Sequence, residues 1–372
     1  MNTHTYEISS RDGASGYLTI DLRALEHNYH LLLQRTAPVP VAAVVKADAY
    51  GLDASRVAPV LYDAGCRDFF VAHFGEAVRL KTFVEPDARI FVLNGLQPGA
   101  ERRCADLGII PVLNSLDQVE NWSRTAVSRG DALPAILQID SGMSRLGLPP
   151  EEMAALADDS ALLKGVDLLY LMSHLASADE NTSKQNGEQL EALRGASGLF
   201  PKLPLCFANS GGIFLGSDFH GALARPGIAL FGGVPSDVPG IAVKPVVRLD
   251  VRVVQTRTVP AGSRVGYGGA HQTTKETRLA TIAAGYADGL PRSLSDRGAA
   301  YHDGVRLPIV GRVSMDSMTI DISALPPGTL KLGSLVEMIG PQQPLEAIAA
   351  DAGTISYEIL TSLGNRYHRE YR

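Results

Sequence analysis

The stretch VAAVVKADAYG, residues 41–51, does most to decide the fold. Five small or β-branched apolar residues precede Lys46 without a charge, which is typical of a strand buried on both faces of a parallel sheet. Lys46 stands at the carboxyl end of this strand, where parallel α/β folds bind their ligands. Burial there disfavours the protonated amine, and a neutral amine can form a Schiff base. A lysine at the end of a strand is more often a surface residue with its charge in water. Other parts of the chain are therefore needed to tell a reactive lysine from a surface one.

A length of 372 residues predicts a large domain joined to a smaller one. The formal net charge of −6 argues against a nucleic-acid surface, and no apolar run is long enough to span a membrane. Residues 1–20 lack the apolar segment of a secretory signal. The three cysteines are widely spaced and form neither a disulfide framework nor a metal-ligand pattern. We therefore expect a cytoplasmic protein with no metal site.

Apolar runs and amphipathic helical stretches alternate along the chain, after a short strand over 17–20 and a helix over 22–36. The apolar runs are 69–72, 90–93, 109–113, 135–139, 166–172 and 205–208, and the helical stretches include 54–64, 75–83, 116–129, 150–157 and 186–199. This alternation implies parallel strands with helical crossovers. The predicted fold is α/β, a (β/α)8 TIM-type barrel over residues 17–245, with an open doubly wound sheet as the alternative. The absence of a G-x-G-x-x-G turn after the first strand favours the barrel.

The sequence changes character after residues 234–245, which concentrate proline and glycine and resemble a linker. Residues 246–259 alternate between apolar and charged side chains, and short apolar runs with turns between them follow. We therefore predict a second, C-terminal all-β domain over residues 246–372, possibly joined by residues 1–16. A segment near the end, 356–363, is predicted to be helical.

Polar residues follow several of the predicted barrel strands. Each has a commoner explanation when taken alone, such as a turn, a helix start, a structural histidine or a surface charge. Their shared position just past a buried strand favours a site, and phosphate sites in such barrels use the last two loops. The residues concerned are Asp140–Gly147, His174, Asn209–Gly212 and Arg225–Ile228.

These motifs resemble those of alanine racemases, barrel-fold enzymes that carry pyridoxal 5′-phosphate (PLP). VVKADAYG, DSGMSRLG, SHLA, NSGG and ARPGIALFG occur in the order and spacing of that family. The family usually continues with His-Gly where this chain has Leu52 and Asp53. The resemblance implies that Lys46 holds the cofactor, that Arg225 faces its pyridine nitrogen and that Arg145 orients a phenolic base. Other implied cofactor-binding residues are Tyr50, His174, Asn209, Ser210, Gly227, Ile228 and, in the second domain, Tyr357.

The second domain extends the resemblance through RVGYG (264–268), GYADG (285–289), GRVSMD (311–316) and ISYE (355–358). In the family, the residue that matches Tyr267 is the second catalytic base and reaches into the partner subunit's active site. Tyr286 and Met315 match substrate-binding residues that also come from the partner. The resemblance therefore implies a homodimer with shared active sites. One departure is Gln138, which stands where many members have a carbamylated lysine, so we expect no role for bound carbamate.

Racemisation of an amino acid requires removal of the α-proton from one face and its return to the other, and PLP supplies the electron sink. Free Lys titrates near ~10.4 and free Tyr near ~10, so Lys46 and Tyr267 must both become more acidic to act near neutrality. The leading hypothesis is a PLP-dependent alanine racemase that supplies D-alanine for the cell wall. A racemase of serine or another small amino acid shares every catalytic residue. Arg225 disfavours a barrel-fold PLP decarboxylase, which places an acidic residue there, and a non-catalytic PLP carrier normally lacks the β domain.

Overall fold

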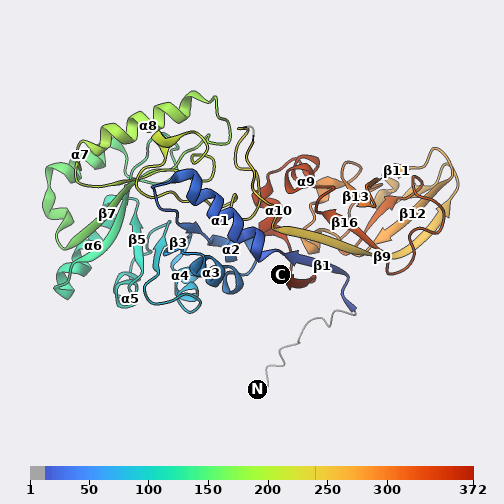
Figure 1. The fold of residues 1–372 in the computed structure, drawn as a ribbon, viewed down its shortest axis with the longest axis horizontal. Coiled ribbons are helices and arrows are strands. Elements are labelled where there is room, and N and C mark those ends of the chain that lie inside the picture. Colours follow the sequence, from blue (N-terminus) through green and yellow to red (C-terminus); the bar gives the residue numbers. More distant parts are fainter. Residues whose placement is uncertain (1–12, 239) are drawn as a thin grey trace, which may run out of the picture. The chain divides into compact units, whose positions relative to one another are not determined.

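The computed structural model describes residues 13–238 and 240–372, which divide into two compact units. Unit 1 comprises the residues up to Ala24 together with Pro245–Arg372, and unit 2 comprises Leu25–Lys244 (Figure 1). The division near residue 245 lies where the sequence suggests a linker, whereas residues 17–24 group with unit 1 rather than with the barrel. That the two units fold as independent domains remains a prediction.

Unit 2 is built on a curled sheet of seven parallel strands that are paired in chain order. The predicted TIM-type barrel class is confirmed, and most helices lie on the outer side of the sheet (Figure 1). A parallel sheet covered by helices buries its strands, as in β3, where all four residues are buried and three of them, Phe69, Phe70 and Val71, are apolar. The strands are β2 (Ala43–Val44), β3 (Asp68–Val71), β4 (Arg89–Val92), β5 (Ile110–Leu113), β6 (Leu133–Gln138), β7 (Val166–Met172) and β8 (Leu205–Cys206).

An irregular segment, residues 222–226, occupies the eighth position of the barrel and connects β8 back to β2. On one side, the N–H of Arg225 donates to the carbonyl of Ala208 at 2.8 Å. On the other side, the carbonyl of Pro226 accepts from the N–H of Val44 at 3.0 Å. Pro226 has no N–H of its own, so this segment cannot continue as a regular strand. It nevertheless brings Arg225 to the same edge of the barrel as the strand ends.

Side chains cap the starts of the helices α1, α3 and α6. The carboxylate of Asp21 accepts from the N–H of Ala24 at 2.9 Å at the start of α1. The hydroxyl of Ser115 accepts from the N–H of Gln118 at 3.3 Å at the start of α6. The helices are α1 (Leu22–Thr36), α2 (Lys46–Gly51), α3 (Ala54–Asp63), α4 (Phe74–Leu80), α5 (Glu101–Asp106), α6 (Leu116–Arg129), α7 (Pro150–Asp158), α8 (Lys184–Ser197) and the 3-10 turns η2 (Ser160–Leu163) and η3 (Ser217–Phe219).

Unit 1 is a mostly antiparallel sheet organised around its longest strand, β9 (Val247–Val259). The path of the sheet is β14-β13-β16-β9-β1-β17, and β12 pairs with both β9 and β15. The predicted all-β character of this region is confirmed, with two short helices in addition. Its remaining elements are β1 (Gly16–Ile20), β10 (Arg264–Val265), β11 (His271–Gln272), β12 (Thr277–Ile282), β13 (Ala299–His302), β14 (Val305–Pro308), β15 (Met318–Asp321), β16 (Leu335–Ile339), β17 (His368–Tyr371), α9 (Leu345–Ala352), α10 (Ser356–Ser362) and the 3-10 turns η4 (Tyr267–Gly269), η5 (Tyr286–Asp288) and η6 (Arg292–Leu294).

Strand β1 lies between β9 and β17, although the sequence analysis grouped residues 17–20 with the barrel. Leu18 and Ile20 are fully buried in unit 1, and Ile20 is opposite both Val247 of β9 and Tyr371 of β17. The carbonyl of Ile20 also accepts from the N–H of Arg372 at 3.0 Å. The alternating pattern of a five-residue strand fits any half-buried sheet, so its partners could not be deduced locally. For residues 1–12, the expected association with the second domain lies outside the described residues.

No helix within residues 13–238 and 240–372 combines the length and the apolar character that crossing a membrane requires.

Candidate active site

Five predicted side chains come from the strand ends of unit 2, at one edge of the barrel. Lys46 follows β2, Arg145 follows β6, His174 follows β7, Ser210 follows β8, and Arg225 lies in the closing segment. Charge interactions link them: Arg145 and Arg225 both act on Lys46, and both arginines and Lys46 act on His174. The structure therefore brings together residues that are up to 179 positions apart, from 46 to 225.

The ε-amine of Lys46 is partly shielded from water, and its pKa lies below its ordinary value of 10.5. Burial is the largest cause, and the positive charges of Arg145 and Arg225 lower the pKa further. The carboxylate of Glu76 acts in the opposite direction. The neutral amine, which is the nucleophilic form, is thus more populated near neutrality than in a free lysine.

The backbone after Lys46 forms a short left-handed turn within α2. Four consecutive residues, 47–50, have φ between 53° and 57°. A left-handed helix costs an L-residue roughly 1–2 kcal/mol, so neighbouring groups must stabilise this turn. The turn buries the ring of Tyr50, which packs on Phe231 with ring centroids 4.7 Å apart.

The hydroxyl of Tyr50 lies against Gly227, in a cradle of polar groups. A Cβ on Gly227 would stand 2.0 Å from this hydroxyl oxygen, so the close approach requires glycine. The hydroxyl of Ser210 accepts from the N–H of Gly227 at 2.8 Å. In the part of the chain that the structure describes, the N–H groups of Gly211 and Ile228 have no acceptor. Free N–H groups beside hydroxyl groups form an anion-binding site.

Asn209 shapes the loop that carries Ser210. Its side-chain oxygen accepts from the N–H of Gly212 at 2.9 Å, and its amide nitrogen donates to the carbonyl of Leu175 at 3.4 Å. A Cβ on Gly211 would stand 2.4 Å from the carbonyl oxygen of Ala178, so this loop is closely packed. The side chain of Asn209 is therefore engaged in holding the turn.

The guanidinium of Arg225 is almost fully buried, with 2% of the residue exposed. It donates to the carbonyls of Ser173 at 2.8 Å and Phe207 at 3.3 Å, and its Nε donates to the sulfur of Cys206 at 3.2 Å. Among the described residues it forms no ion pair with a carboxylate. Arg225 therefore presents a buried cation with donors only.

The imidazole of His174 is neutral, because its pKa lies well below the ordinary value of 6.5. Burial is the main cause, followed by the charges of Arg225, Arg145 and Lys46. A buried network that the sequence did not reveal supports this histidine. Gln189 of α8 donates to the carbonyl of His174 at 2.9 Å and to the hydroxyl of Ser141 at 3.1 Å. A glutamine on a helix carries no sequence signal that distinguishes it from a surface residue.

Asp140 organises the loop that bears Arg145. One of its carboxylate oxygens accepts from the N–H groups of Gly142, Met143 and Ser144 at 2.9, 2.9 and 3.1 Å. Burial would raise the pKa of Asp140, but these donors more than compensate and lower it below 3.8. Arg145 itself is exposed and has no hydrogen-bond partner among the described residues.

The predicted residues of the second domain lie in unit 1. Tyr267, Met315 and Tyr286 are large side chains that stand 70%, 53% and 44% exposed, and Tyr357 on α10 is 40% exposed. The N–H of Tyr286 donates to the carbonyl of Ser314 at 3.0 Å, so the loops that carry Tyr286 and Met315 are paired. The turn that carries Tyr267 lies against the loop that carries Met315. A Cβ atom placed on Gly266 would stand 3.2 Å from the backbone nitrogen of Arg312 in that loop.

Two family models match the chain in succession. The model of the alanine racemase N-terminal domain matches residues 20–235, and that of the alanine racemase C-terminal domain matches residues 246–371. The chain belongs to the alanine racemase family. Members of this family are amino-acid racemases, which are isomerases, so the enzyme class expected from the sequence is confirmed.

Individual alanine racemases match nearly the whole chain. The protein named "Alanine racemase, catabolic" of Rhizobium johnstonii is 63% identical over 362 residues, covering 97% of this chain and 96% of its own length. The alanine racemase of Brucella canis is 56% identical over 371 residues, covering 96% and 94%. The crystal structure of alanine racemase from Bartonella henselae with covalently bound pyridoxal phosphate has a TM-score of 0.94 at 45% identity, covering 96% of this chain and 100% of that chain.

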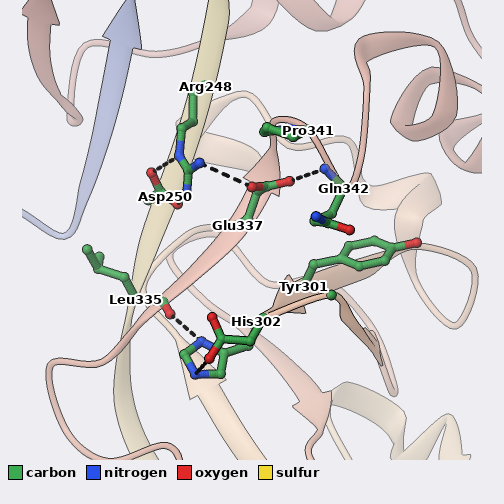
Figure 2. Close-up of a pocket in the computed structure, with 10 residues that line it drawn as sticks. Arg248, Asp250, Tyr301, His302, Leu335, Glu337, Pro341 and Gln342 are labelled. Atoms are coloured by element: carbon green, nitrogen blue, oxygen red, sulfur yellow. Dashed lines mark hydrogen bonds and ion pairs between the residues drawn. The ribbon is translucent and has the colours of Figure 1, made fainter.

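Unit 1 of this alanine racemase family member also contains a cavity of about 500 Å³ (Figure 2). Arg248 projects into it and pairs with Asp250 at 2.6 Å and with Glu337 at 3.5 Å. Glu337 also accepts from the N–H of Gln342 at 2.7 Å. Arg248 is thus paired with carboxylates on two sides, and none of the predicted site residues lines the cavity.

Proposed function

We propose that the protein interconverts L- and D-alanine with PLP as its cofactor. The observation that carries the proposal is the arrangement at one edge of the unit 2 barrel. There, the amine of Lys46 has a lowered pKa, and Tyr50, Ser210 and Gly227 form an anion cradle. The Bartonella relative, whose structure holds covalently bound pyridoxal phosphate, supports the choice of cofactor.

The residues of unit 2 fit the chemical groups of PLP. The hydroxyls of Tyr50 and Ser210 and the N–H groups of Gly211 and Ile228 suit its phosphate, as anion sites in this class of barrel require. The amine of Lys46 suits its aldehyde. We assign Tyr357 to the phosphate as well, on the resemblance alone. When bound, PLP supplies a sink for the electron pair that remains after the α-proton leaves.

Arg225 sets how strong that sink is. A guanidinium stays protonated and offers donors only, so Arg225 cannot maintain a proton on the pyridine nitrogen as a carboxylate would. A weaker sink shortens the lifetime of the carbanion and limits side reactions such as transamination. This is the physical reason to favour racemisation over decarboxylation. The neutral imidazole of His174 packs beside the ring without adding a charge.

We assign proton transfer to two bases, Lys46 on one face of the substrate and Tyr267 of the partner subunit on the other. Lys46 takes or returns the α-proton through its neutral amine, whose population burial increases. The exposure of Tyr267, at 70%, and of Met315 and Tyr286 supports their role at a subunit interface, because large exposed side chains often mark one. The homodimer is part of this proposal.

Replacement of Lys46 tests the assignment. Lys46→Ala should abolish racemisation of alanine in a chiral chromatographic assay. It should also leave no PLP attached to residue 46 after borohydride reduction and peptide mass spectrometry. The control is Lys184→Ala at the exposed start of α8, which should match the wild type in both measurements. Full activity of Lys46→Ala would remove the basis of the proposal.

Replacement of Tyr267 tests the division between the two bases. Tyr267→Phe should slow exchange of the α-proton with deuterium more from L-alanine than from D-alanine, because each base serves one face. Equal losses from both enantiomers would reject the two-base mechanism. The same preparation, assayed across a panel of small L-amino acids, decides between alanine and the alternative substrate serine.

The biological direction of the reaction is a separate question. Supply of D-alanine for the cell wall remains the expectation from sequence, while the 63% identical relative is named catabolic. Deletion of the gene distinguishes the two roles: D-alanine auxotrophy supports the first, and loss of growth on alanine as a nitrogen source supports the second.

A further inference from the structure

Glu76 of α4 contacts the turn that follows Lys46 without being one of the predicted site residues. One oxygen of its carboxylate accepts from the N–H of Ala47 at 2.8 Å. The other oxygen accepts from the N–H groups of Ala72 at 2.7 Å and His73 at 3.2 Å. Glu76 thus joins the end of β2 to the loop between β3 and α4 through three backbone donors. Hydrogen bonds to an ionised carboxylate are roughly twice as strong as neutral ones.

The turn over residues 47–50 needs such support, because its left-handed backbone is unfavourable for four consecutive residues other than glycine. Side-chain packing does not provide all of the support that this turn needs. A cavity of about 220 Å³ lies behind the turn and is lined by Asp48, Asp53 and Glu76, among others. At its far end, the turn is secured by the carboxylate of Asp48, which accepts from the N–H of Ala54 at 2.9 Å. At its near end, beside Lys46, the corresponding side-chain acceptor is Glu76.

We propose that Glu76 is a positioning residue for Lys46: its carboxylate fixes the left-handed turn through the N–H of Ala47 and so sets the direction of the lysine and of Tyr50. The inference rests on the proposed function of Lys46 and deepens it. Glu76 touches neither substrate nor cofactor in this account. It acts through the backbone of the turn that connects Lys46 and Tyr50, two residues that the proposed chemistry uses.

The negative charge of Glu76 also affects the pKa of Lys46. The charged groups that act on Lys46 are Arg145 from the loop after β6, Arg225 from the closing segment and Glu76 from α4. Lys46 in turn acts on the nearby imidazole of His174, which follows β7. Both arginines lower the pKa of Lys46, and Glu76 opposes them. Loss of the carboxylate should therefore lower the pKa of Lys46 further, in addition to loosening the turn.

Two readouts on the PLP-free apoprotein test the proposal without relying on activity. The first is amide hydrogen exchange of residues 47–53 by mass spectrometry. Glu76→Ala should accelerate it by about tenfold or more, the factor that corresponds to losing one hydrogen bond to a charged acceptor. The second is the pH profile of Lys46 acylation by an amine-reactive reagent, whose midpoint should move to lower pH in Glu76→Gln.

A matched control is Glu101→Gln at the start of α5. The carboxylate of Glu101 also accepts a backbone N–H beside a helix start, from Gly99 at 2.8 Å, but it serves a different loop. This variant should leave both readouts at the wild-type values. Peptides from α8 should exchange at the wild-type rate in all variants, which separates local loosening from global unfolding.

The possible outcomes distinguish the positioning role of Glu76 from the proposed function of Lys46. Wild-type exchange and a wild-type acylation profile in both Glu76 variants would overturn the positioning role. Global unfolding of both variants, seen as faster exchange throughout unit 2, would also overturn it and assign Glu76 to stability alone. If Lys46 of the wild type fails to retain PLP, the proposed function fails instead, and the two apoprotein readouts still decide the role of Glu76.

Discussion

At the scale of single residues, the contact between Gly227 and Tyr50 is the tightest constraint on the phosphate cradle. The buried ring of Tyr50 packs on Phe231, so its hydroxyl cannot simply swing away from a new methyl group. Gly227→Ala should force a shift of the ring at a cost of about 1–3 kcal/mol, as overpacking does. We expect the affinity of the apoprotein for PLP to fall by about tenfold or more, measured by fluorescence titration.

The control for this prediction is Gly187→Ala. Gly187 lies in α8, and a Cβ there meets no atom within 4 Å. Alanine in a helix is favoured over glycine by roughly 0.5–1 kcal/mol, so this variant should bind PLP normally and unfold at the same or a higher temperature. Unchanged PLP affinity in Gly227→Ala would show that the ring yields more easily than its packing suggests.

At the scale of elements, the loop after β6 depends on Asp140. Asp140→Asn keeps the shape but removes the charge, so we expect a loss of about 1–3 kcal/mol in the free energy of unfolding. We also expect a lower kcat/KM, because the loop carries Arg145. The pKa of the wild-type carboxyl is lowered on folding, so its stabilisation is fully present above 3.8 and is lost as pH falls through the folded value. Denaturant titrations at several pH values should therefore show the two proteins converging in acid.

The control is Asp159→Asn, whose carboxylate accepts from only one N–H, that of Ala161 at 3.0 Å. This variant should lose less stability and keep full activity, because its loop carries no site residue. A pH-independent difference between wild type and Asp140→Asn would contradict the role of the charge.

The elements differ in how far the sequence determines them. Helix α6 was predicted to the residue, because a serine cap, a regular apolar face and Gly130 in the left-handed conformation mark its limits. The short helices α5 and α9 were missed, since six to eight residues contain too little periodicity. The left-handed turn after Lys46 contains no glycine before Gly51, so no local signal marked it.

The candidate site shows the same limit. Residues in loops directly after strands, such as Lys46 and Arg225, were predictable because strand ends meet at one edge of a barrel. Glu76, Gln189 and Cys206 were not, because they act through hydrogen bonds between segments that are distant in sequence. Such contacts leave no pattern within a short stretch of sequence.

At the scale of the whole molecule, the proposed sharing of sites between subunits predicts complementation between two inactive variants. A dimer of one Lys46→Ala chain and one Tyr267→Phe chain would contain one site with both changes and one intact site. Co-expression with random pairing should restore about a quarter of the wild-type activity per chain, since half the dimers are mixed. A chiral assay of the unfractionated mixture measures this fraction, and purified mixed dimers should show about half of the wild-type activity per chain.

The control pairs Lys46→Ala with Arg225→Ala. Both residues lie in unit 2 of one chain, so every site of such a mixed dimer carries a defect, and mixing should give no activity beyond that of the two variants assayed separately. Failure of the first pair to recover activity would place Lys46 and Tyr267 of the same chain in one site, or would exclude Tyr267 from it.

The position of β1 has a consequence for how the protein is made. β1 leaves the ribosome early, yet both of its neighbours, β9 and β17, are translated much later. The carbonyl of Arg372 accepts from the N–H of Leu22 at 2.8 Å, so the final residue of the sequence closes against the beginning of α1. The barrel unit can condense during synthesis, while the sheet of unit 1 must wait until β9 and β17 have been translated. Truncation of the chain before His368 would remove β17 and leave β1 as an open sheet edge, to which other chains can pair and aggregate.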